Sequence, residues 1–275
     1  MLNNFIVNRS KNFHKLLLEL DDVNVSYNFQ KILLEIKPDK KFIKNLRVSV
    51  LKYLTKNINS YYNLNINKIN DISKYRELIL RLPNITPNGV INPRLETHKE
   101  YKKIVNLIKL MCSNYKLNEI YDLYELPDVR LMRSNKFGYN SRREYSSSVI
   151  HSDRWAGHPS DAKVAIFING DSNNTVHFFK PKISDKNFFS KQHNYKSSIK
   201  KYGYSFIKKQ NKNMITLFDQ SCLHKTVNKN ADLRLSLDFG LILKKKKLKK
   251  FEKRYKNKFF NINKNIPIKI KNLIS

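Results

Sequence analysis

The feature that most constrains this chain is a series of short extended segments, without helices between them, across residues 128–242. Each segment is rich in Val, Ile, Phe, Tyr or Thr, and Gly, Asn, Asp, Ser or Pro separates it from the next. The predicted strands are 128–134, 143–151, 163–169, 174–179, 202–207, 213–218, 222–227 and 232–242. Such a series predicts a double-stranded β-helix, the jelly-roll or cupin-like arrangement of two packed sheets.

Residues 1–127 are predicted to be mainly helical and to pack outside this core, so that the fold class is α+β. One helix is expected after Pro38, with its apolar face formed by Phe42, Ile43, Leu46, Val50, Tyr53 and Leu54. Another is expected from Thr97, where Thr97 and Glu100 match the capping-box pattern. Its apolar positions are Ile104, Leu107, Ile108 and Met111. A third is expected over 71–82.

Residues 183–200 form a polar insertion between two predicted strands. It is expected to be either a loop over a pocket mouth or a surface excursion.

The chain is strongly basic, with a formal net charge of +32. Clustered Lys and Arg can bind nucleic acid, but Lys, Asn and Ile dominate the whole sequence, and a solvated lysine-rich surface is the favoured interpretation. The charge is densest in the predicted basic tail, residues 243–275. Residues 241–275 hold 13 Lys or Arg against Glu252. This segment can be a solvated tail or an arm for a polyanion or anionic membrane surface. Its four aromatic residues leave open that it covers the barrel.

No apolar run approaches the roughly 20 residues that span a bilayer. The N-terminal residues lack a continuous apolar segment and a cleavage site, so they do not indicate a secretory signal. The two cysteines, Cys112 and Cys222, give no disulfide framework and are expected to be buried. A cytoplasmic location is expected.

Two side chains near the end of a predicted strand indicate a metal site. His151 and Asp153 are two residues apart, and residues at that spacing on a strand point to the same face. A non-haem iron site needs two imidazoles and one carboxylate, with other positions left open. His224, between two later extended segments, is the candidate for the second imidazole.

A second His-x-acid pair, His98 and Glu100, serves as a comparison. It lies in the first turn of a predicted helix, where residues two apart point in nearly opposite directions. We therefore expect no shared metal there.

Ten residues after His224, the run 232–239 alternates strictly. Leu233, Leu235, Leu237 and Phe239 occupy one face, and Arg234, Ser236 and Asp238 occupy the other. An Arg and a Ser on one strand face near a metal can hold a carboxylate through a bidentate guanidinium contact and a hydroxyl.

The order of His151, Asp153, His224, Arg234 and Ser236 resembles the Fe(II)/2-oxoglutarate-dependent oxygenases, in particular their phytanoyl-CoA dioxygenase-like branch. The flank HSDRWAGHP, residues 151–159, is similar to the metal motif of oxygenases from aminoglycoside gene clusters. The resemblance covers roughly residues 128–242.

The resemblance implies that His151, Asp153 and His224 bind Fe(II), and that Arg234 and Ser236 bind the far carboxylate of 2-oxoglutarate. It implies hydroxylation of a C–H bond with O2, coupled to decarboxylation of 2-oxoglutarate to succinate and CO2. The expected substrate is a small molecule or a sugar or lipid conjugate. Nucleic-acid oxidation, and metal or polyanion binding without turnover, remain the alternatives.

Four residues are expected to contact the substrate: Trp155, Arg154, His177 and Arg130. Arg133 is a further candidate for an anionic substrate, and core packing or surface pairing is the competing interpretation for each. His158 is expected to be a polar pocket or surface residue.

Overall fold

The computed structural model describes residues 33–115, 117–119, 121–132, 149–158, 160–170, 175–212, 214–227, 233–243 and 259–261. Its helices are α2 (Lys40–Tyr62), α3 (Arg76–Leu80), α4 (His98–Asn114) and α5 (Tyr195–Tyr202). Its first strands are β1 (Leu33–Ile36), β2 (Tyr121–Glu125), β3 (Asp128–Met132), β4 (Ala162–Gly170) and β5 (Thr175–Lys180). The later strands are β6 (Ser205–Lys209), β7 (Ile215–Asp219), β8 (Leu223–Val227), β9 (Arg234–Leu243) and β10 (Phe259–Asn261).

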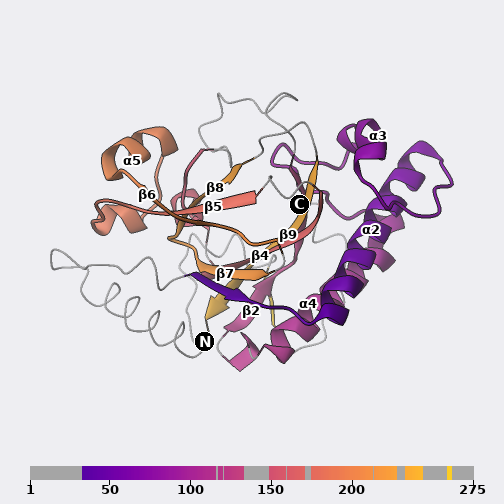
Figure 1. The fold of residues 1–275 in the computed structure, drawn as a ribbon, viewed down its shortest axis with the longest axis horizontal. Helices are drawn as coiled ribbons and strands as arrows, with labels where there is room; N and C mark the ends of the chain where they lie inside the picture. Colours follow the sequence, from indigo (N-terminus) through magenta and orange to yellow (C-terminus); the bar gives the residue numbers. More distant parts are fainter. Residues whose placement is uncertain are drawn as a thin grey trace.

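The strands form two antiparallel sheets. The larger sheet has the order β1-β7-β4-β9-β2-β10, with β3 also paired to β9, and the smaller has the order β6-β5-β8. Figure 1 shows α2 and α4 along one side of the molecule and α5 on the opposite side, near β6. The double-sheet α+β fold predicted from the sequence is thus confirmed.

Seven of the eight predicted strands are present as β3 to β9, with ends shifted by a few residues. The remaining one, 143–151, lies mostly outside the described residues. Within them, His151 forms an isolated bridge to His224. The sheet also takes β1 and β2 from the segment predicted as mainly helical, and β10 from the predicted basic tail. The larger sheet therefore takes strands from all three predicted parts of the chain. The proposed division at residues 127 and 242 does not coincide with a boundary of this sheet.

The helices α2, α3 and α4 share an apolar core with the larger sheet, whereas α5 packs in the second apolar cluster. Asp39 caps α2 by accepting a hydrogen bond from the Phe42 amide at 2.9 Å, and the predicted apolar face of α2 is buried except for the partly buried Ile43. This face belongs to the same apolar core as Leu235, Leu237 and Phe239 of β9. The opposite face of β9 therefore points between the two sheets.

The predicted capping box of α4 is wrong. The Thr97 side chain makes no cap contact with α4 and instead accepts a hydrogen bond from the Arg94 amide at 2.9 Å. The reason is a short 3-10 turn, Leu95–Thr97, which precedes the helix. The Thr97 hydroxyl closes this turn and does not cap α4. No helix among the described residues is long and apolar enough to cross a membrane.

Candidate metal centre

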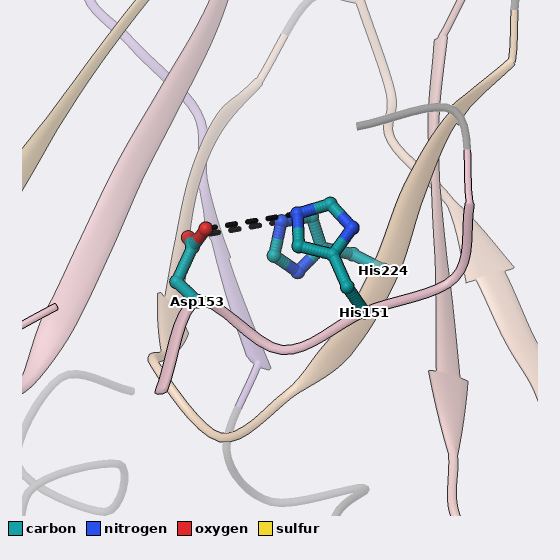
Figure 2. A group of neighbouring side chains, drawn as sticks. All are labelled: His151, Asp153 and His224. Atoms are coloured by element: carbon teal, nitrogen blue, oxygen red, sulfur yellow. Dashed lines mark ion pairs between the residues drawn. The ribbon is translucent and has the colours of Figure 1, made fainter. Parts of the chain in front are cut away.

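Two histidines from distant parts of the chain meet at one edge of the smaller sheet. The His151 amide donates to the His224 carbonyl at 3.0 Å, and the His224 amide donates to the His151 carbonyl at 2.8 Å. This reciprocal pair fixes the two backbones side by side, and the ring centroids lie 4.5 Å apart. Figure 2 shows both rings directed toward Asp153.

The Asp153 carboxylate completes a group that can hold a metal ion. Its Oδ1 lies 3.8 Å from His151 Nε2, and its Oδ2 lies 3.7 Å from His224 Nε2. One ligand atom from each of the three residues lies within 4.8 Å of the others, and this is the one such group found in the described part of the chain. We predicted that these three residues converge, and they do.

The reason given for the convergence needs correction. Asp153 is not on a strand with His151 but begins a 3-10 turn, Asp153–Ala156. Ser152 caps this turn, and its hydroxyl donates to the Gln220 carbonyl at 2.7 Å. The Arg154 amide donates to the same carbonyl at 3.1 Å. The turn is thereby attached to the segment that leads into β8, which carries His224.

Both imidazoles are held in the form that a metal requires. Nδ1 of His151 lies 2.8 Å from the Val149 carbonyl, and Nδ1 of His224 lies 3.0 Å from the Cys222 carbonyl. A carbonyl only accepts, so each Nδ1 donates its hydrogen and each Nε2 keeps a free lone pair. Burial, with the neighbouring His224, lowers the pKa of His151 to about 3, and burial also lowers the pKa of His224. Both rings are neutral near pH 7, as metal ligands must be.

A partly buried lysine that the sequence analysis missed lies beside Asp153. Lys163 Nζ lies 3.3 Å from Asp153 Oδ2 and 3.0 Å from Asp238 Oδ2. Burial alone would raise the pKa of Asp153, but Lys163 and the two histidines hold this pKa well below its usual range. Asp238 in turn binds Arg130 at 3.1 Å. A chain of alternating charges therefore connects the metal ligand to the inner face of β9.

Arg234 lies on this inner face and is 2% exposed. Its Nε and Nη1 atoms are buried and have no hydrogen-bond partner among the described residues. Burial lowers the pKa of Arg234 to about 10, while Asp238 acts in the opposite direction, so the guanidinium remains charged at pH 7. An unpaired buried charge is costly, and it indicates an anionic partner that the described residues do not supply.

Ser236, between Arg234 and Asp238 on the same face, is buried, and its Oγ lies 3.5 Å from the Arg130 carbonyl. Four residues along a strand span about 13 Å. Arg234 is thus separated from Asp238, and from the Lys163 contact to the metal ligand, by the length of a small molecule.

Three of the residues expected to contact the substrate have other partners. Trp155 is fully buried and donates from Nε1 to the Phe188 carbonyl at 2.7 Å, which is core packing. Arg130 is paired with Asp238 and also with Asp128, at 3.2 Å. Arg154 lies 4.0 Å from Asp161. Arg133 lies outside the described residues.

His177, the fourth, points away from the metal site. On β5 its neighbour Phe178 pairs with His224, and these two rings are in contact on the inner face. Since successive strand residues point to opposite faces, His177 faces outward. There it contacts Phe206 with ring centroids 5.6 Å apart. The structure therefore does not bring His177 together with the metal ligands.

The segment 183–200, predicted as a loop over a pocket mouth or a surface excursion, has local structure of its own. It contains a 3-10 turn and the start of α5, and it contributes Tyr195 to the site. The Tyr195 ring stacks on the His151 imidazole, with centroids 5.2 Å apart and planes inclined by 6°. Only the Asn194 cap, which accepts from the Ser197 amide, was a local sign of this helix.

His158 was expected to be a polar pocket or surface residue, and in the structure it makes specific polar contacts. Its Nε2 lies 3.3 Å from Glu125 Oε1, and its Nδ1 lies 2.8 Å from Ser160 Oγ. This cluster lies beside the turn that carries Asp153.

No model of a protein family matches this chain. A search of curated proteins also gave no match.

The chain has distant similarity to several solved structures. One is AviO1 from Streptomyces viridochromogenes Tue57, at 10% identity over 78% of this chain and 91% of that one, with a TM-score of 0.39. Another is SnoK, a non-heme alpha ketoglutarate dependent carbocyclase from nogalamycin biosynthesis, at 8% identity over 79% and 84%, with a TM-score of 0.41. A third is a Pseudomonas putida prolyl-4-hydroxylase, at 10% identity over 72% and 98%, with a TM-score of 0.31.

SnoK is described as an alpha ketoglutarate dependent enzyme, which is the class that the resemblance in the sequence indicated. At TM-scores of 0.41 or less these similarities carry no argument about function. The functional conclusion depends on the geometry of the site.

Proposed function

We propose that this chain is a non-haem Fe(II)- and 2-oxoglutarate-dependent oxygenase. The observation that carries the proposal is the pairing of two features on the inner side of the sheets. One is a group of two imidazoles and one carboxylate, and the other is a buried guanidinium of which two nitrogens have no partner in the part of the chain that the structure describes. A metal-binding protein without a cosubstrate needs the first feature and has no use for the second.

The donor set fits ferrous iron. Two neutral imidazole nitrogens and one carboxylate oxygen on one side of a metal leave the remaining positions open, and this set is typical of non-haem iron oxygenases. Bound Fe(II) would supply the activation of O2 that oxidises both 2-oxoglutarate and a second substrate.

The residues of this chain would orient the reactants. His151, Asp153 and His224 would hold the metal, and Arg234 with Ser236 would hold the far carboxylate of 2-oxoglutarate. The balanced reaction we propose takes R–H, O2 and 2-oxoglutarate to R–OH, succinate and CO2. A small molecule or a sugar or lipid conjugate stays the proposed substrate class. We also propose a cytoplasmic location, which two free cysteines and oxidisable iron support.

The test uses the full chain without a known substrate. Protein purified without metal is supplied with Fe(II), 2-oxoglutarate and O2, and succinate is measured over time. We expect slow succinate formation that requires both the metal and O2, since oxygenases of this type turn over 2-oxoglutarate without a substrate. Tight metal binding, with no more succinate than the same mixture gives without protein, would instead indicate a metal-binding protein without turnover.

A further inference from the structure

The outward face of the smaller sheet carries a cluster of aromatic side chains. We define the aromatic platform as His177, Phe179, Tyr204 and Phe206. Phe179 contacts Tyr204 and Phe206 at centroid distances of 5.4 and 5.9 Å, and His177 contacts Phe206 at 5.6 Å. Tyr204 is 44% exposed and Phe206 is 56% exposed. Phe179 is only 5% exposed, so Tyr204 and Phe206 are the exposed rings of the platform, and exposed apolar rings that lie together are typical of a binding surface.

The platform is separate from the metal centre. In the register of β5 and β8, Phe178 pairs with His224, and Phe179, the next residue of β5, pairs with Phe206 of β6. Because alternate strand residues face opposite sides, the platform lies on the other side of the sheet from His224. A ligand on the platform therefore needs neither the metal nor 2-oxoglutarate.

Positive charge surrounds these rings. The strands β5, β6 and β8 contain no Asp or Glu. Lys225 Nζ lies 5.8 Å from the centre of the Phe179 ring. Lys209 is exposed and pairs with His177 in the register of β5 and β6, so it shares the outward face. Neither lysine makes an ion pair with a described residue.

We propose that the aromatic platform binds single-stranded nucleic acid. Every base has a flat face that can stack on Phe206 or Tyr204, and Lys209 and Lys225 provide the charge that phosphates require. Charge complementarity favours this occupant over a second copy of the chain. A second copy would bring its own net charge of +32 to a face that is already basic.

The experiment must separate base stacking from general attraction to a lysine-rich protein. Binding of a labelled oligo-dT of about twelve nucleotides, a typical site length, is measured by fluorescence anisotropy. Inorganic polyphosphate of matched charge, which has phosphates and no bases, is the comparison ligand. The test variant is Tyr204→Ser with Phe206→Ser. The control is Leu95→Ser with Leu110→Ser, which removes two exposed apolar side chains elsewhere, 78% and 52% exposed.

We expect the test variant to bind oligo-dT at least about tenfold more weakly than wild type, and the control to stay within about twofold. Polyphosphate binding should be the same in all three proteins. Phe206→Tyr should retain oligo-dT binding, because it keeps a flat ring. Retained binding in this variant would also show that substitution at position 206 does not by itself prevent folding. Lys209→Glu with Lys225→Glu should weaken both ligands, more than Lys102→Glu with Lys103→Glu on α4.

Three results would overturn the proposal. In the first, the test variant and the control lose oligo-dT affinity equally. In the second, polyphosphate and oligo-dT bind wild type with the same affinity and respond alike to Phe206→Ser. In the third, light scattering shows a wild-type dimer that Phe206→Ser dissociates, which would make the platform an interface between copies. None of these results depends on whether the metal centre is active.

Discussion

The space between the two sheets and the outer face of the smaller sheet differ in how their polar groups are satisfied. Between the sheets, most charged groups are buried or partly buried and paired with one another, as in the contacts of Lys163 with Asp153 and Asp238. Arg234 is the contrast there, with two buried nitrogens that have no partner among the described residues. On the outer face of the smaller sheet, Lys209 is exposed and Lys225 partly exposed, and neither has a carboxylate partner among the described residues. Buried pairs fix geometry, because each partner restricts the other, whereas exposed charges remain free to meet a flexible polyanion.

The comparison also explains why histidines of one chain have different roles. His224 and His177 lie on adjacent strands, one residue out of register, so that they point to opposite faces. His224 has a backbone carbonyl at Nδ1 and a carboxylate near Nε2, which suits a metal ligand. His177 has aromatic neighbours and faces outward. Position on the pleat, and not residue type, separates the two.

The largest effect should come from removing a metal ligand on the inner side. Asp153→Ala should lower 2-oxoglutarate turnover by about a thousandfold or more, because metal assistance is worth several kcal/mol. His177→Ala, on the outer face, is the matched control and should keep turnover near wild type. Succinate formation at saturating Fe(II) measures both. Equal loss in the two variants would contradict the separation of the faces.

The next effect concerns Arg234. Arg234→Leu removes the guanidinium, of which two nitrogens have no partner among the described residues. It should weaken the binding of 2-oxoglutarate about a hundredfold, since hydrogen bonds to charged groups are worth about 1.5–3 kcal/mol each. Metal affinity should not change, because no ligand is lost. Arg234→Lys should recover part of the affinity, because the charge returns without two-pronged geometry. Anaerobic titration of 2-oxoglutarate into the iron-loaded protein measures this. An unchanged affinity in the leucine variant would remove Arg234 from the cosubstrate site.

A smaller effect is expected from Lys163. Lys163→Met removes the positive charge beside the Asp153 and Asp238 carboxylates. It should lower the free energy of unfolding of the metal-free protein by about 2 kcal/mol. A bound cation supplies positive charge beside Asp153, so metal should stabilise this variant more than wild type. Lys225→Met, on the outer face, should change stability by less than about 0.5 kcal/mol. Urea unfolding with and without Co(II) measures all three proteins.

Much of the fold and the metal ligands could be predicted because they depend on local patterns. Alternation in β9 gave both the apolar outer side and the inward Arg234, and the triad followed from residue chemistry. The backbone conformation at Asp153 could not be predicted from the His-x-Asp spacing. A strand and a capped 3-10 turn can both place the side chains of residues two apart close to the same metal ion. Lys163, Tyr195 and the pairing of β10 with β2 depend on contacts between distant segments, for which the sequence has no local sign.

The smallest expected effect is the pH dependence of stability, and it belongs to the inner face. The pKa of His151 is about 3 in the folded, metal-free protein and 6.5 as its ordinary value, so below pH 6.5 the unfolded chain takes up a proton that the folded chain does not. Stability must therefore fall as the pH is lowered. Between pH 7.5 and 5.5 His151 should account for about 1.4 kcal/mol of that fall, and His224 acts in the same direction. Urea unfolding of the metal-free protein at the two pH values measures it. His151→Asn should reduce the difference, and Phe206→Ser, on the outer face, should retain it. A wild-type difference that His151→Asn leaves unchanged would mean that the burial of this imidazole does not govern the acid sensitivity, and that the contrast between the two faces is weaker than the structure implies.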